Sequence, residues 1–258
     1  MMKSLVLPIL VLGLLTLTAC ASSASSQVLT DSPWLLTELG GEAPLPETSI
    51  TAEFDDEGRV GGTSGCNSYS TSYTVDGNQI EFGEEMVGTL MSCPDPVMEQ
   101  ERLYLEALGA AATFEIGDDE LTLFDADGNP LARFQAVSQD LAGTSWEVIS
   151  YNTGTQAVRS VIIGTEITAD FSEDGQLSGN ASCNHYSTTY ETEGDKISIG
   201  PATVTEMYCE EPEDVMEQEV QYLAALETAD KYKIQGLNME MRTSEGSLVA
   251  SFKRTDTP

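Results

Sequence analysis

The sequence predicts a mainly β (α+β) protein made of two tandem small antiparallel domains, each with one α-helix. The segment GCNSYSTSY at 65–73 returns as SCNHYSTTY at 182–190, and the similarity extends through both halves of the chain. Between these motifs, short runs of β-branched and aromatic residues alternate with turn residues, which is typical of antiparallel strands. We therefore assign one domain to residues 31–138 and a second to 139–258.

The strands of each copy follow in the same order. Each copy opens on a Trp, Trp34 or Trp146, which we expect to anchor a core. A strand, a Gly-containing turn and a second strand come next, as TAEFDDEGRVGG and TADFSEDGQLSG. The Asp-Gly pairs at 76–77 and 127–128 predict hairpin turns.

A helix is predicted after the second cysteine of each copy. Pro96 and Pro212 suit a helix start, and acidic residues beside them favour the positive end of the helix dipole. Apolar residues then recur at helical spacing. They are Val97, Tyr104, Leu105 and Leu108 in the first copy and Val215, Tyr222, Leu223 and Leu226 in the second.

The N-terminus predicts export. Residues 1–20 combine one charge, Lys3, with an apolar run too short for a permanent membrane span. They end in Leu-Thr-Ala-Cys, which resembles a bacterial lipobox and makes Cys20 the lipid attachment site, with an ordinary signal peptide as the alternative. Ala21 follows the cysteine, which favours the outer membrane facing the periplasm, and residues 21–30 indicate a flexible tether.

The charge balance limits the possible partners. The chain has 11 basic and 43 acidic residues, for a formal net charge of -32. Nucleic acid is excluded as a partner, because phosphate binding needs clustered Lys and Arg. The remaining interpretations are a well-solvated surface or a cationic partner, besides the membrane reached through the N-terminal lipid.

The remaining cysteines favour structural disulfides. With Cys20 lipidated, each copy keeps two, and repeat symmetry pairs Cys66 with Cys93 and Cys183 with Cys209. Closing loops of 27 and 26 residues would contribute about 3 kcal/mol each. Free thiols stay open as the alternative, whereas a catalytic thiol lacks a CxxC spacing and, in the first copy, any His partner.

A single histidine, His185, replaces Ser68 of the first copy. A hydrolase using it with Ser182 or Ser187 is the weakest functional hypothesis, because no GxSxG elbow is present. A solvent-facing loop residue is the favoured interpretation. One His and two Cys fall short of a zinc site, so we expect no metal and no cofactor.

The spaced pattern resembles the META domain (HslJ-like) family in both copies. The shared positions outside the cysteines are Gly65, Asn67, Tyr69 and Tyr73 in the first copy and Asn184, Tyr186 and Tyr190 in the second. Each copy continues with Thr-x-Met-x-Cys, at 89–93 and 205–209, and then Met-Glu-Gln-Glu. The second copy departs at Ser182, where the family has Gly, and at His185.

The resemblance implies a small barrel-like β domain with a helix, found in bacterial envelope proteins and linked to stress responses, with no established enzymatic activity. We expect the motif residues to shape and pack a turn. The expected function is that of a lipid-anchored, non-catalytic envelope protein with a role in stress response or partner binding. The alternative is a carrier that holds a small ligand in a barrel cavity.

Overall fold

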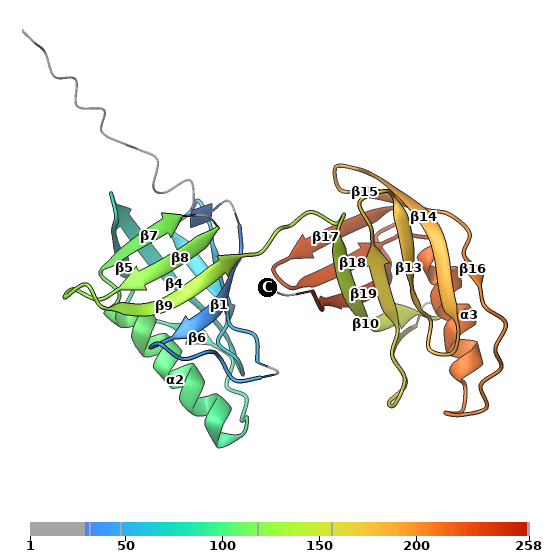
Figure 1. Ribbon diagram of the computed structural model, residues 1–258, viewed down its shortest axis with the longest axis horizontal. Helices are drawn as coiled ribbons and strands as arrows, with labels where there is room; N and C mark the ends of the chain where they lie inside the picture. Colours follow the sequence, from blue (N-terminus) through green and yellow to red (C-terminus); the bar gives the residue numbers. More distant parts are fainter. Residues whose placement is uncertain (1–28, 31, 47, 118, 156, 257–258) are drawn as a thin grey trace, which may run out of the picture.

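The computed structural model describes residues 29–30, 32–46, 48–117, 119–155 and 157–256. The predicted signal peptide, Cys20 and most of the predicted tether lie outside these residues. The chain forms two β-barrels that lie side by side and are joined by one connecting segment (Figure 1). Within the described ranges, no helix combines the length and apolar character needed to cross a membrane.

The first barrel is a closed ring of eight antiparallel strands. The strands are β1 (Trp34–Leu39), β2 (Thr51–Phe54), β3 (Arg59–Thr63), β4 (Ser68–Asp76), β5 (Gln79–Phe82), β7 (Thr113–Gly117), β8 (Glu120–Phe124) and β9 (Pro130–Ala136). Their order around the ring is β3-β2-β1-β9-β8-β7-β5-β4, and the pairing of β4 with β3 closes it. A short strand, β6 (Val87–Gly88), pairs with β4 outside the ring and leads into helix α2 (Asp95–Ala110).

The second barrel repeats this ring. Its strands are β10 (Thr144–Asn152), β12 (Thr168–Phe171), β13 (Gln176–Asn180), β14 (His185–Glu193), β15 (Lys196–Ile199), β17 (Lys231–Gln235), β18 (Asn238–Arg242) and β19 (Leu248–Arg254). The pairing of β10 with β19 closes the ring. Strand β16 (Thr203–Val204) corresponds to β6 and precedes helix α3 (Val215–Leu226), whereas β11 (Val158–Ser160) belongs to a longer loop of this copy. The predicted fold class is therefore confirmed.

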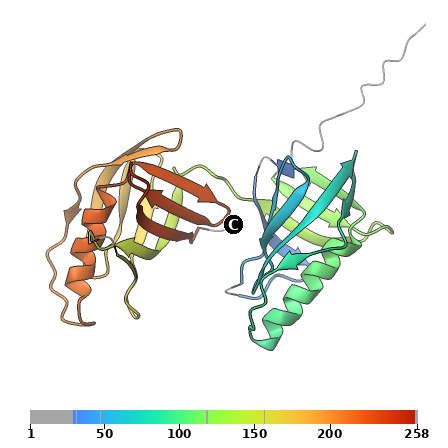
Figure 2. The same cartoon turned by 180° about the vertical axis from the view of Figure 1, so that it is seen from behind.

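Each helix lies against its own barrel (Figure 2). The buried side chains on one face of each helix make this contact. Tyr104 and Leu108 of α2, and Tyr222 and Leu226 of α3, are buried at the predicted helical spacing. Pro96 occupies the first turn of α2, as expected, whereas Pro212 lies three residues before α3 begins. The same helix face also buries polar residues, Gln100 and Glu101 in α2 and Gln218 and Glu219 in α3.

Large side chains fill the barrel interiors. In the first barrel the Tyr104 ring contacts Tyr69 and Phe134, with centroid distances of 5.5 and 6.3 Å. In the second, Tyr222 contacts Tyr186 at 5.9 Å. Edge-to-face packing of this kind places aromatic rings where a barrel with a ligand cavity would have open space. Both Trp residues at the starts of the copies are also buried, which confirms them as core anchors.

The start of the first domain differs from the expectation. Leu29, which composition places in the flexible tether, is completely buried in the first core. The indole Nε1 of Trp34 donates a hydrogen bond to the Leu29 carbonyl oxygen at 3.0 Å. An apolar residue with both contacts belongs to the folded domain, which therefore begins before residue 31.

The two barrels meet through a small contact. Leu35, Val137 and Leu237 form an apolar cluster between them. Beside it, the Gln139 side-chain amide donates a hydrogen bond to the Gly236 carbonyl oxygen at 3.4 Å. Each barrel has its own much larger core, so the stability of each domain is expected to come mainly from its own residues.

Candidate functional site

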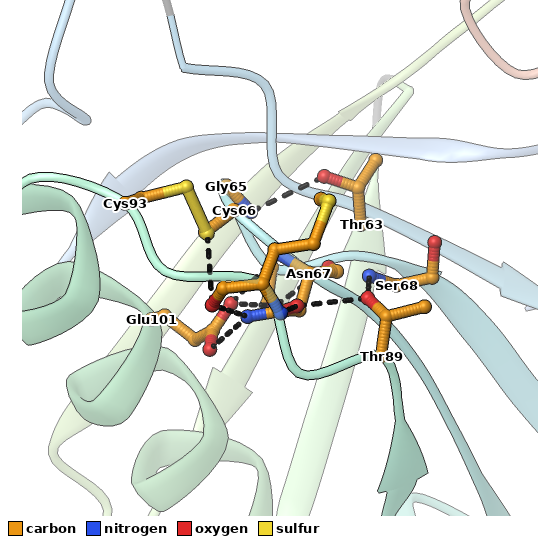
Figure 3. Close-up of a disulfide and its surroundings, with 10 residues drawn as sticks. Thr63, Gly65, Cys66, Asn67, Ser68, Thr89, Cys93 and Glu101 are labelled. Carbon is orange, nitrogen blue, oxygen red and sulfur yellow. Dashed lines mark hydrogen bonds between the residues drawn. A yellow bond between two sulfur atoms is a disulfide. The ribbon is translucent and has the colours of Figure 1, made fainter.

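The shared motif begins in the loop that joins β3 to β4, where Cys66 and Asn67 face helix α2, and continues along β4 (Figure 3). Cys66 in this loop is bonded to Cys93, just before the helix, and Cys183 is bonded to Cys209 in the second copy. The predicted pairing within each copy is therefore confirmed. These cysteines are not free thiols, and persistent disulfides indicate an oxidising, exported compartment.

Asn67 connects three segments of the first domain (Figure 3). Its backbone N–H and its side-chain Nδ2 donate to the two carboxylate oxygens of Glu101 on α2, at 2.9 and 3.0 Å. Its Oδ1 accepts hydrogen bonds from the Met91 N–H at 2.7 Å and from the Thr89 hydroxyl at 2.8 Å. Nδ2 also donates to the Met91 carbonyl oxygen at 3.3 Å. We call these four residues the first Asn clamp.

The second copy contains the same arrangement. Asn184 donates from its backbone and its Nδ2 to Glu219 at 2.8 and 3.0 Å. Its Oδ1 accepts from Met207 N–H and the Thr205 hydroxyl, both at 2.7 Å, and Nδ2 donates to the Met207 carbonyl oxygen at 3.0 Å. These four residues form the second Asn clamp. Every hydrogen-bonding atom of both Asn side chains is therefore in use.

The Glu101 carboxylate is held in its charged form. Burial alone would raise the pKa of Glu101, but hydrogen bonds from Ser64, Asn67 and the Cys66 N–H lower the pKa below its usual value. The Ser64 hydroxyl lies 2.5 Å from Glu101 Oε2. A carboxylate with a lowered pKa and saturated oxygens is a poor proton donor or acceptor near neutral pH. The position of Ser64 is taken by Ala181 in the second copy.

The motif tyrosines hold the strands to one another and to the helix. The hydroxyl of Tyr69 lies 2.6 Å from that of Tyr104 and donates to the Thr51 carbonyl oxygen at 3.1 Å. The Tyr73 hydroxyl donates to the Asp55 carbonyl oxygen at 2.9 Å. Burial raises the pKa of Tyr69 and of Tyr73, so both stay protonated. The second copy repeats these contacts. The Tyr186 hydroxyl lies 3.0 Å from that of Tyr222 and donates to the Thr168 carbonyl oxygen, and the Tyr190 hydroxyl donates to the Ser172 carbonyl oxygen.

The residue before the motif cysteine has a left-handed backbone in both copies. Gly65 has φ of 104° and Ser182 has φ of 93°. Such a conformation disfavours a side chain, and Ser182 has two compensating contacts. Its Oγ accepts a hydrogen bond from Gln218 Nε2 at 2.6 Å, and its N–H donates to Asn180 Oδ1 at 2.8 Å. The missing Gly therefore leaves the turn unchanged.

Sequence reasoning assigned no role to the helix residues Gln100 and Glu101. Gln100 is buried and accepts from the Leu45 N–H at 2.6 Å while donating to the Thr48 hydroxyl at 2.9 Å. Gln218 makes equivalent contacts in the second copy. The available signal was that polar residues recur in both copies on the helix face that carries Tyr104. Polar residues on an apolar face need internal partners.

His185 lies on the outer side of β14. Because side chains alternate along a strand, Tyr186 points into the barrel and His185 toward solvent. The His185 N–H donates to the Thr205 hydroxyl at 3.2 Å, but in the described part of the chain its imidazole makes no hydrogen bond. The Ser182 hydroxyl is occupied by Gln218. No Ser-His-Asp arrangement is formed by the described residues, and none of their His, Cys and carboxylate groups cluster as metal ligands.

The family comparison matches both halves. A family model described as the META domain matches residues 27–138 and again 139–256. No curated protein matches the chain.

Solved structures resemble about half of the chain at a time. A protein from Burkholderia xenovorans, determined by NMR, is 27% identical over 48% of this chain and 95% of its own, with a TM-score of 0.39. A second NMR structure is 18% identical over 43% and 92%, with a TM-score of 0.36. A crystal structure of a DUF4847 family protein from Bacteroides vulgatus is 14% identical over 44% and 98%, with a TM-score of 0.35.

Proposed function

Since the chain belongs to the META domain family, which matches it twice and over nearly all of its mature length, we propose a lipid-anchored, non-catalytic protein of the bacterial envelope. In this proposal Cys20 carries the lipid, and the two domains face the periplasm from the outer membrane. Their role is to bind a partner, in the setting of a stress response.

The non-catalytic role is proposed because the motif residues are bonded to one another. The two cysteines of each copy are bonded to each other, and the Asn and Glu of each clamp bind one another. The motif tyrosines are buried with raised pKa values. Residues engaged in this way support the fold and have no free group with which to attack or protonate a substrate.

The packed barrel interiors argue against the carrier alternative. A small-molecule site usually needs a concave cavity lined largely by apolar side chains. The positions inside each ring are instead occupied by contacting aromatic rings, as for Tyr104 with Phe134. Partner binding at the surface therefore fits better than ligand storage inside.

The anchor is tested by metabolic labelling with a palmitate analogue and by cell fractionation. The wild-type protein is expected to take up the label and to remain with the outer membrane. Cys20→Ala is expected to lose the label and to enter the soluble fraction. Unchanged membrane partitioning of Cys20→Ala would contradict the anchor. The partner-binding role is tested separately, by cross-linking in envelope fractions with and without stress.

A further inference from the structure

Both domains expose apolar side chains at the same place in the fold, just before the helix. We define apolar loop 1 as residues 89–92 and apolar loop 2 as residues 205–208. In loop 1, Leu90 is 100% exposed and Met91 57%; in loop 2, Met207 is 53% and Tyr208 78% exposed. A single exposed apolar residue is ordinary, but adjacent pairs at equivalent sites of two domains call for an explanation.

The backbones of these loops are held in place. Met91 is bound through both its N–H and its carbonyl oxygen by Asn67, and Met207 is bound in the same way by Asn184. A disulfide follows within two residues in each copy. A partner that contacts the exposed side chains would therefore order little additional backbone, and such preorganisation favours affinity.

The two loops differ in sequence but keep the same surface character. Leu90 of loop 1 corresponds to Glu206 in loop 2, and Ser92 corresponds to Tyr208. The second large apolar side chain precedes the methionine in loop 1 (Leu90) and follows it in loop 2 (Tyr208), so each loop exposes a pair. Retention of the pair at shifted positions favours a contact surface over a requirement of the fold, since Leu90 is fully exposed and the other three side chains keep more than half of their surface exposed.

Exposed carboxylates flank both loops in the sequence. We call Glu84, Glu85 and Asp95 the acidic rim of loop 1, and Glu210, Glu211 and Glu213 the acidic rim of loop 2, which also carries Glu206 within the loop itself. No Lys or Arg occurs from residue 60 to 101 or from 197 to 230. An apolar centre inside a negative rim is complementary to an apolar surface that carries positive charge, and it is repelled by anionic lipid.

We propose that apolar loops 1 and 2 are docking surfaces for a cationic amphipathic polypeptide segment. The apolar face of the segment covers Met91 and Leu90, or Met207 and Tyr208, and its Lys and Arg residues meet the acidic rim. This inference rests on the partner-binding role proposed above, but it does not depend on the lipid at Cys20.

The test uses the whole chain with Cys20→Ala, so that a failure of the anchor does not affect it. Fluorescence anisotropy measures binding of a labelled amphipathic Leu/Lys peptide, and calorimetry counts the sites. We expect saturable binding at both loops that weakens at high salt, because screening reduces the attraction of the rims. A Leu/Glu peptide of equal length is expected to bind much less.

Two double variants locate the sites. Leu90→Ser with Met91→Ser, and Met207→Ser with Tyr208→Ser, are each expected to lower the affinity of one loop by about tenfold or more. Calorimetry should then count one strong site in each double variant and none in the combined variant. Both change only exposed side chains and leave the clamp hydrogen bonds to the backbone. Ile163→Ser is the matched control, because Ile163 is 97% exposed in a different loop, and it is expected to bind like the parent.

Unchanged binding of the combined variant, no binding by the parent chain, or equal loss with Ile163→Ser would overturn the proposal. Binding to anionic vesicles that disappears with the same double variants would also overturn it, in favour of a membrane surface. If the peptide fails to bind while envelope cross-linking still captures a partner in the combined variant, partner binding stands and these loops are not its site.

Discussion

The two Asn clamps have the same frame and different neighbours. Asn, Glu, Thr and the backbone of Met occur in both, with hydrogen bonds that agree within a few tenths of an ångström. The first clamp adds the Ser64 hydroxyl on Glu101 and has Gly65 in the left-handed turn. The second has Ala181 and Ser182 at these positions. The shared residues are thus those that join barrel, loop and helix, and the surrounding residues can vary.

The largest expected effect comes from removing the clamp Asn itself. Asn67→Ala leaves a buried carboxylate with fewer donors and the Met91 backbone without its partner, which should cost about 3–4 kcal/mol in the first domain. Asn184→Ala should have a similar effect in the second domain. Differential scanning calorimetry of the two domain transitions measures both. A change below about 1 kcal/mol in either domain would mean that the clamp does not hold the fold.

Removal of a disulfide should cause the second largest loss of stability. Replacing Cys66 and Cys93 together by Ser frees a loop of 27 residues in the unfolded chain, and the chain-entropy model gives a loss of about 3 kcal/mol. The matched pair Cys183 and Cys209 closes a loop of 26 residues and should behave alike. Denaturant titration of each double variant tests this equivalence. A much larger loss in one domain would show that its clamp depends on the disulfide for its geometry.

Acid should weaken the first domain in a way that depends on Glu101. The pKa of Glu101 is lowered in the folded state, so the folded domain binds fewer protons than the unfolded chain. The resulting stability is complete above the unfolded value of about 4.3 and is lost as the pH falls through the folded pKa. Ser64→Ala removes one donor and should shrink this dependence. Denaturation at several pH values measures it, and an identical acid profile in Ser64→Ala would contradict the assignment.

Substitutions at Gly65 and Ser182, in the left-handed turns before the motif cysteines, should have smaller and different effects on stability. Gly65→Ala forces a side chain into a left-handed conformation beside Gln100 Nε2, where a Cβ would lie at 3.3 Å, and should cost about 1–2 kcal/mol. Ser182→Gly relieves the same strain but loses the hydrogen bond to Gln218, so its net effect should stay within about 0.5 kcal/mol. Thermal shifts of the two variants compare them. Equal destabilisation by both would contradict this account of the turns.

The architecture could be predicted from sequence patterns, because internal repeats indicate domains and the spacing of apolar residues indicates which side chains are buried. The duplicated motif, the helical spacing around Tyr104 and the cysteine symmetry predicted the domains, helices and disulfides that the structure contains. Leu29 was missed because the apolar contact that buries it comes from distant parts of the first core, while residues 21–26 before it are all Ala or Ser.

Only one of the two central residues of the first Asn clamp could be predicted from the sequence. Asn67 was expected to shape a turn, but its partner Glu101 lies 34 residues away on a helix whose rotation relative to the barrel is a tertiary property. Glu101 also sits among other carboxylates in a strongly acidic chain, where a solvent-exposed position is the ordinary expectation. Its burial beside Tyr104 could be inferred only once the helix face was placed.

A double-mutant cycle on Asn67→Ala and Glu101→Gln tests most directly that the shared motif is a structural clamp. The free energy of unfolding of the first domain is measured for the wild type, both single variants and the double variant. We predict a coupling energy of about 2 kcal/mol, because either substitution alone leaves the other group buried with its hydrogen bonds broken. Single effects that add within about 0.5 kcal/mol would contradict the account.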